Sequence, residues 1–178
     1  MIEHKRLKKR TILEYSPILQ LRRNHGLEHA TLHVLAEKNL NQRFAGYSDL
    51  KGFWIVGEVQ TEELVHAVEE ALSRLQSGDH LLAVHPNCGT NFATAGILAG
   101  GAASLTMLGS EKRLKDKLER IPFAMTLATL AIIIAQPLGL LIQEKITTTG
   151  NMGKIRVESI QKINQGAFSA HRILTRKA

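Results

Sequence analysis

The chain has 178 residues, a formal net charge of +7 and a single cysteine. That length suits one modest domain with an appendage and excludes a large multidomain protein. A hydrophobic fraction of 44% excludes a disordered chain, and one cysteine excludes an intramolecular disulfide framework. The charge is unevenly spread: residues 1–23 and 144–178 each have a net charge of +5, residues 89–143 have +2, and residues 24–88 have −5.

Residues 1–17 form a basic arm without an apolar stretch, so we expect no signal peptide before the apolar segments described below. Its basic residues, within positions 5–10, favour contact with the anionic headgroups of a lipid bilayer. No aromatic platform or helix-turn-helix pattern accompanies this charge, so we expect no nucleic-acid partner.

Residues 18–88 are expected to form the first part of an α+β domain. The spacing of apolar residues predicts a helix over Ile18–Asn39 and a second helix from Thr61 to Gly78. Runs of β-branched, aromatic and other apolar residues predict strands at Phe53–Val59 and Leu81–Val84.

The first predicted helix contains an H-x-x-E-H motif made by His25, Glu28 and His29. Residues i and i+4 share a helix face, so His25 and His29 can bind one metal ion. Glu28 is then a candidate general base for a metal-bound water, and His33 extends the same face by one turn. The alternative is that these side chains form hydrogen bonds at a packed interface.

A second polar motif, HPNCGTN, follows the second predicted strand. His85 and Cys88 have H-x-x-C spacing, which is short enough for both to bind one ion. If the sheet packs on the first helix, they can join His25 and His29, and this mixed donor set suits zinc or another borderline metal. In one alternative, Cys88 is a nucleophile activated by a helix N-terminus and a histidine. In another, the motif is only a tight turn before the next helix.

Residues 89–143 contain two long uncharged segments, separated by the highly charged stretch Glu111–Arg120. Asn91–Gly109 and Ile121–Ile142 are both long enough to cross a bilayer core, which needs about 20 apolar residues. They predict a transmembrane helical hairpin, and the alternative is a hairpin buried in a soluble protein.

Such a hairpin places both termini on the same side of the membrane. The basic N-terminal arm favours the cytoplasm for that side, so we expect an inner (cytoplasmic) membrane protein with cytoplasmic termini. Gly96 and Gly100 lie one helical turn apart and allow another helix to approach closely. We therefore expect a homo- or hetero-oligomer through this face.

Residues 144–178 begin with the spacer TTTGNMG. The alternation over Lys154–Ile163 and the run Phe168–Leu174 predict a β-hairpin that completes the sheet begun before the membrane segment. The predicted fold class is therefore α+β: a small sheet with two packed helices and an inserted two-helix transmembrane hairpin.

Two resemblances accompany these patterns. The local H-x-x-E-H motif is similar to that of the inverzincin (pitrilysin-type) metallopeptidases, which implies zinc on His25 and His29 and a catalytic base at Glu28. The third ligand of that family, a downstream helical glutamate, has no match here at the family's spacing. The segments RRNHGLEHATLHVL, with its N-H-x-x-E-H-A motif, GFWIVGEVQTEELVHAVEEALSRLQSG and LAVHPNCGTN resemble an uncharacterised bacterial membrane-protein family, a domain of unknown function.

The sequence therefore predicts an integral membrane protein with a candidate zinc site on a membrane-surface domain. If the protein is an enzyme, metal-dependent, peptidase-like hydrolysis is the first candidate. The alternative is a non-catalytic membrane subunit or assembly factor whose histidine and cysteine motifs are structural.

Overall fold

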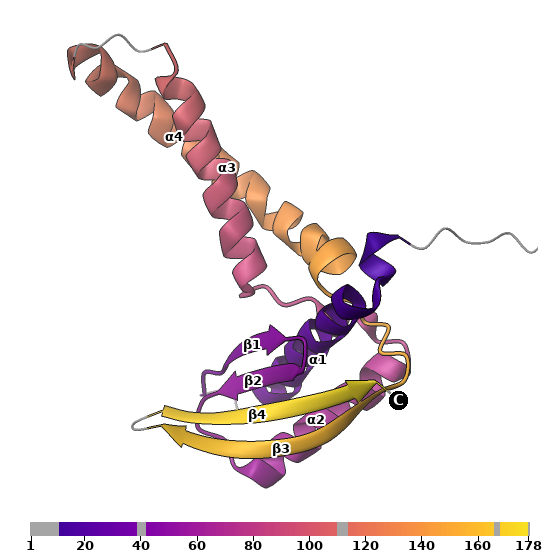
Figure 1. Ribbon diagram of the computed structural model, residues 1–178. Coiled ribbons are helices and arrows are strands. Elements are labelled where there is room, and N and C mark those ends of the chain that lie inside the picture. Colours follow the sequence, from indigo (N-terminus) through magenta and orange to yellow (C-terminus); the bar gives the residue numbers. More distant parts are fainter. Residues whose placement is uncertain (1–10, 39–41, 110–113, 166–167, 178) are drawn as a thin grey trace, which may run out of the picture. The chain divides into compact units, whose positions relative to one another are not determined.

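The computed structural model describes residues 11–38, 42–109, 114–165 and 168–177 (Figure 1). The predicted lipid-binding positions 5–10 lie outside these residues. The elements in chain order are η1 (Ile12–Glu14, a 3-10 turn), α1 (Ser16–Lys38), β1 (Ala45–Asp49), β2 (Gly52–Val56), α2 (Thr61–Gln76), η2 (His80–Ala83, a 3-10 turn), α3 (Gly89–Met107), α4 (Leu114–Ile142), η3 (Gln143–Thr147, a π-helical turn), β3 (Ile155–Gln165) and β4 (Phe168–Lys177).

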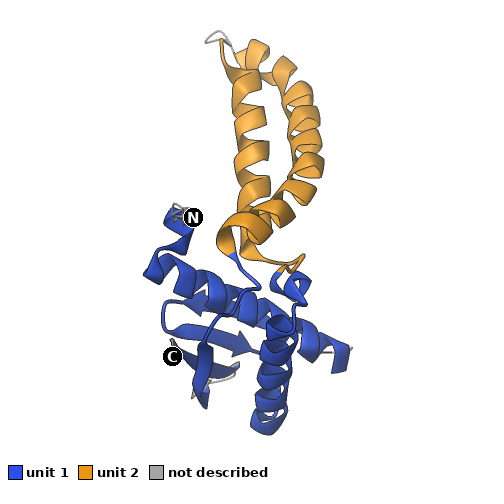
Figure 2. Ribbon diagram, turned by 90° about the vertical axis from the view of Figure 1, so that its right-hand side faces the viewer, with its two compact units in different colours: residues 1–83, 148–178 blue, residues 84–147 orange. Residues whose placement is uncertain are grey.

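The chain divides into two compact units, which Figure 2 distinguishes by colour. The first comprises residues 1–83 and 148–178, and the second comprises residues 84–147.

The first unit contains one sheet of four strands in the order β1-β2-β4-β3, with every neighbouring pair antiparallel (Figure 1). The C-terminal strand β4 pairs with β2, for example through Ile55 and His171. Strands from before and after the second unit therefore form a single sheet. The predicted α+β class with a small sheet is confirmed.

The helices α1 and α2 pack on each other and against this sheet. Strand residues alternate between two faces, and Phe53, Ile55 and Ile173 are completely buried in the core with the helices. The apolar stripe of α2, which includes Leu64 and Leu75, faces the same core. Burial of these side chains is the main stabilising contribution to this unit.

One predicted strand is not present, and one observed strand was not predicted. The predicted strand at Leu81–Val84 is wrong, because His80–Ala83 forms a 3-10 turn that buries Leu82 and Ala83. A short apolar run does not distinguish a strand from a buried helical turn.

The strand β1 has no predicted counterpart, because its sequence AGYSD lacks a run of β-branched residues. A turn aligns it with β2. The carboxylate of Asp49 accepts hydrogen bonds from the backbone amides of Lys51 (2.7 Å) and Gly52 (3.1 Å). An aspartate that binds the amides following it is a common turn device.

In the second unit, α3 and α4 pack side by side. At one end Asn91 of α3 packs against Gly139 of α4 and accepts a hydrogen bond from Gln143 (2.5 Å). At the other end Arg120 donates to the carbonyl oxygens of Thr106 (3.1 Å) and Leu108 (2.7 Å), the orphan acceptors at the end of α3.

One helical segment that the structure describes, Leu114–Thr147, is long and apolar enough to cross a membrane. Only 11% of its most apolar window is buried within the chain. A core helix of a soluble protein would bury most of that surface.

Candidate metal centre

The helix α1 holds the predicted motif within the first unit. Its middle, from Asn24 to Leu35, is buried except at His25 and His33, which are half-buried. A Cβ atom on Gly26 would clash with the carbonyl oxygen of Thr149. Glycine at this position therefore lets the segment before β3 cross α1 closely.

His25 and His29 lie together on this helix, as their spacing predicts. The centroids of the two imidazole rings are 4.4 Å apart and the rings are inclined at 64°. His29 is only 2% exposed. The pair therefore brings two of the commonest metal-binding side chains within reach of one ion.

A hydrogen bond fixes the orientation of the His29 ring. Its Nδ1 atom lies 2.9 Å from the carbonyl oxygen of Ala83, at the end of η2. A carbonyl oxygen only accepts, so we assign the proton to Nδ1 and the lone pair to Nε2. Metal-binding histidines are commonly held by such a bond from the other ring nitrogen.

Glu28 is buried and turned toward β1. The hydroxyl of Ser48 donates a hydrogen bond to its carboxylate, and a Cβ atom on Gly46 would clash with the same carboxylate. Burial raises the pKa of Glu28, while the Ser48 bond and the nearby charge of His25 oppose that shift. These contacts with the Glu28 carboxylate explain why β1 has small residues at Gly46 and Ser48.

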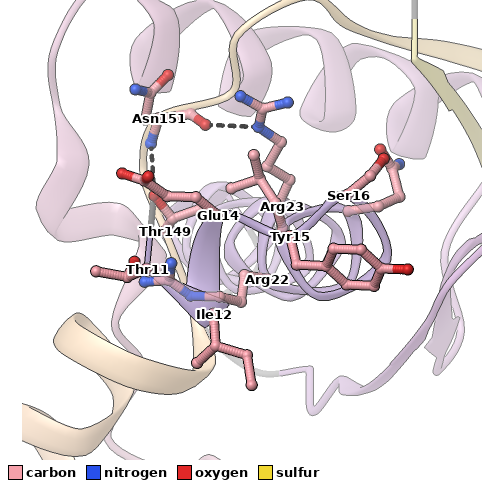
Figure 3. A pocket seen from close by; sticks show the side chains of 11 residues that line it. Thr11, Ile12, Glu14, Tyr15, Ser16, Arg22, Arg23, Thr149 and Asn151 are labelled. Atoms are coloured by element: carbon pink, nitrogen blue, oxygen red, sulfur yellow. Dashed lines mark hydrogen bonds between the residues drawn. The ribbon is translucent and has the colours of Figure 1, made fainter. Parts of the chain in front are cut away.

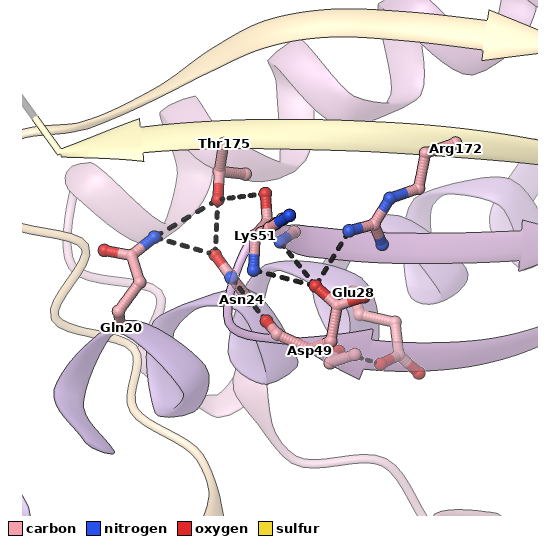
Figure 4. A network of polar contacts seen from close by, with 9 residues as sticks. Gln20, Asn24, Glu28, Asp49, Lys51, Arg172 and Thr175 are labelled. Carbon is pink, nitrogen blue, oxygen red and sulfur yellow. Dashed lines mark hydrogen bonds and ion pairs between the residues drawn. The ribbon is translucent and has the colours of Figure 1, made fainter. Parts of the chain in front are cut away.

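A polar network that the sequence analysis missed surrounds Asn24, one residue before His25 (Figure 4). The Asn24 amide donates to the carbonyl oxygen of Asp49 (2.7 Å) and accepts from Thr175 (2.6 Å) and Gln20 (3.1 Å). Asp49 also forms an ion pair with Arg172 (2.8 Å). Asn24 stands in the polar run RRNHGLEH, so no local pattern distinguished it in the sequence.

The remaining predicted ligands lie elsewhere along the chain. His33 is on α1, four residues beyond His29. His85 and Cys88 belong to the second unit, where the Cys88 amide bonds the His85 carbonyl (3.3 Å) in a turn. Cys88 is the N-cap of α3, and its sulfur accepts a hydrogen bond from the amide of Thr90 (3.4 Å).

The structure thus brings His25 and His29 together within the first unit and directs the Glu28 carboxylate toward Ser48. His85 and Cys88 share a turn at the start of the second unit.

The sequence of the chain was compared with known proteins. A relative, an uncharacterized protein from Picosynechococcus sp. (strain ATCC 27264 / PCC 7002 / PR-6), is 38% identical over 161 residues, covering 82% of this chain and 73% of the relative. No solved structure is significantly similar to the chain. The model of a domain of unknown function, DUF6391, matches residues 20–160. The chain therefore belongs to the DUF6391 family.

Proposed function

We propose that this protein is a membrane-anchored metal-binding protein in which His25 and His29 are ligands to a zinc-type ion. The observation that supports it best is the bond from His29 Nδ1 to the Ala83 carbonyl oxygen, 2.9 Å long, beside the ring of His25. This bond orients Nε2 as a donor and lowers the entropy lost when a metal binds.

We propose Cys88 as the third donor. It follows Ala83 by five residues, which span at most about 18 Å. Because the Ala83 carbonyl contacts His29, this connection is short enough for the thiol to reach the histidine pair. A sulfur at a helix N-terminus also favours the thiolate, which is the form that binds metals. His85 and His33 remain candidates for a fourth position.

We propose that α3 crosses the membrane together with α4. Both helices expose large apolar side chains, such as Phe92 (68%) and Ile97 (73%) on α3 and Ile134 (62%) on α4. Exposed apolar surface of this extent on a helical pair favours lipid contact. With this hairpin we propose an inner-membrane protein whose two termini lie in the cytoplasm.

We propose that the site binds a metal ion, and we assign no catalysed reaction to it. A general base must reach the water that the metal activates. The Glu28 carboxylate is buried and bound by Ser48, which favours a role in holding α1 on β1. If no metal binds, the alternative is a membrane subunit or assembly factor in which His29 serves the packing of α1 against η2.

The test is metal analysis of the full chain, purified in mild detergent after growth with added zinc. We expect about one metal ion per wild-type chain. His25→Ala and His29→Ala should each reduce that ratio at least tenfold, because loss of one of three protein ligands removes most of the affinity. Cys88→Ser should do the same. His66→Ala changes an exposed histidine of α2 and serves as the matched control.

A metal-free wild-type protein would contradict the proposal, as would an equal loss of metal from His66→Ala. Retention of metal by Cys88→Ser would leave the histidine pair in place and reject Cys88 as the third donor.

A further inference from the structure

A cavity of about 810 Å³ lies at the start of α1, within the first unit (Figure 3). Its walls are η1, the first turns of α1 and the segment that precedes β3. No residue of the proposed metal centre lines it. Two arginines, Arg22 and Arg23, are its basic side chains.

Arg22 is already engaged by the protein. Its guanidinium donates to the carbonyl oxygens of Thr148 (2.8 Å) and Leu13 (3.4 Å). Burial lowers the pKa of Arg22, and the charge of Glu14, which also lines the cavity, opposes that shift. The charge of Glu14 therefore offsets part of the charge of Arg22.

Arg23 supplies the cationic charge that remains. Its Nε atom donates to the carbonyl oxygen of Asn151 (2.9 Å), as Figure 3 shows, and this bond holds the guanidinium at the cavity. Within the described residues no ion pair involves Arg23. Burial lowers the pKa of Arg23 with no opposing carboxylate. An anion in the cavity would therefore gain a partly dehydrated arginine partner.

The rim of the cavity is apolar and exposed. Ile12 is 75% exposed and Tyr15 is 65% exposed, although both line the cavity. An aliphatic and an aromatic side chain beside an arginine form the combination that proteins present at the boundary between headgroups and acyl chains. A soluble anion would need only the arginine.

The covalent chain connects this cavity to the apolar helix. Thr149, in the cavity wall, follows the segment Leu114–Thr147 by two residues, a distance of at most about 7 Å between Cα atoms. The basic positions 5–10 precede Thr11, which is also in the wall. If the helix crosses a bilayer, the cavity wall includes the residues at which the chain leaves it.

We propose that the cavity binds a phosphate-bearing group, namely the headgroup of an anionic phospholipid. Arg23 contacts the phosphate through its guanidinium, which matches phosphate geometry, and Ile12 and Tyr15 contact the acyl chains. This inference rests on the proposed membrane anchor and is independent of the metal centre.

The experiment uses the full chain in detergent and counts retained lipid by native mass spectrometry. The probes are phosphatidylglycerol and phosphatidylcholine with identical acyl chains. We expect wild type to retain phosphatidylglycerol about fivefold better, the factor that corresponds to about 1 kcal/mol per basic residue near an anionic surface. Arg23→Ala should remove the preference. Arg156→Ala, which removes an exposed arginine of β3, should preserve it.

Glu14→Gln is a second variant that leaves both arginines intact. Among the described residues of the cavity wall, Glu14 is the one carboxylate, so retention of phosphatidylglycerol should increase when it is removed. This variant keeps the proposal testable if Arg23→Ala fails to fold.

Equal retention of phosphatidylglycerol by wild type and a folded Arg23→Ala would overturn the proposal. Displacement of the lipid by glycerol 3-phosphate at similar concentration would support the phosphate chemistry and overturn the lipid as its source. Metal content measured on the same Arg23→Ala sample should equal that of wild type, which separates this site from the metal centre.

Discussion

At the scale of single residues, His171 is a buried histidine whose protonation affects the stability of the sheet. It is completely buried on β4, and its Nε2 atom lies 3.1 Å from the hydroxyl of Thr61 at the start of α2. Its Nδ1 atom is buried without a hydrogen-bond partner among the described residues. Burial, with a smaller effect from Lys162 on β3, lowers the pKa of His171 below its ordinary value of 6.5.

The lowered pKa means that the unfolded chain binds a proton more readily than the folded chain. The stability due to neutral His171 is therefore fully present above pH 6.5 and is lost as pH falls from there toward the folded pKa. The slope is at most about 1.4 kcal/mol per pH unit for one proton.

Unfolding in detergent at a series of pH values between 5 and 8 measures this effect. We expect His171→Gln to show a smaller loss of unfolding free energy on acidification than wild type. His66→Gln, at an exposed position, should follow wild type. Identical pH profiles for wild type and His171→Gln would refute the prediction.

The sequence was informative about individual residues where local spacing decides their position. His25 and His29 are four residues apart on one helix, so their proximity followed from helix geometry alone. The partner of Glu28 was not predictable in this way. Ser48 approaches it only because β1 pairs with β2 and packs on α1, and that contact depends on tertiary structure.

At the scale of elements, the contact between α3 and α4 depends on a glycine. A Cβ atom on Gly139 would lie 2.5 Å from Asn91 Oδ1 and 3.1 Å from the Asn91 Cα atom. Oδ1 of Asn91 also accepts from Gln143, which is completely buried and accepts from the backbone amide of His85 (2.9 Å). Gly139 therefore makes room for the polar network that joins the two helices.

Gly139→Ala should lower the free energy of unfolding by about 1–3 kcal/mol, because an added methyl group forces the helices or Asn91 to move. Gly101→Ala is the matched control, since no atom lies within 4 Å of a Cβ there. It should be neutral or slightly stabilising, as alanine is the better helix former. Unfolding by SDS, titrated into a milder detergent, measures the free energy of unfolding of both variants. Equal destabilisation by the two substitutions would contradict this prediction.

The elements themselves followed from the sequence to different extents. Apolar periodicity predicted α1 and α2 within a few residues, and alternation predicted the β3–β4 hairpin. The strand β1 and the turn η2 did not follow. Their conformations depend on the Asp49 turn and on burial against α1, respectively.

At the scale of the whole molecule, the small-residue face of α3 predicts a homo- or hetero-oligomer. A Cβ atom on Gly96 or Gly100 would meet nothing within 4 Å, so no described residue covers this face. Close packing of helices in lipid uses such residues. Gly96→Leu and Gly100→Leu should shift an oligomer toward the monomer in mild detergent, measured by light scattering.

Gly101→Leu makes the same change on another face of α3 and should leave the oligomer unchanged. A monomeric wild-type protein, or an equal effect of all three substitutions, would reject the prediction.

The whole second unit interrupts the first unit in sequence, between residues 83 and 148. The single sheet, interrupted in sequence, was predictable because the C-terminal residues alternate as strand residues do, and β4 does pair with β2. The polar network of Asn24 was not predictable, because its partners lie up to 151 residues away in the sequence.

X-ray absorption at the zinc edge of the purified, zinc-supplemented wild-type chain identifies the atoms that bind the metal. We expect histidine nitrogens at about 2.0–2.1 Å and one sulfur at about 2.3 Å from the zinc of the wild-type chain, with most of the zinc signal lost in Cys88→Ser and in His29→Ala. A spectrum with only oxygen ligands, or one that is unchanged in His29→Ala, would contradict the proposed metal centre.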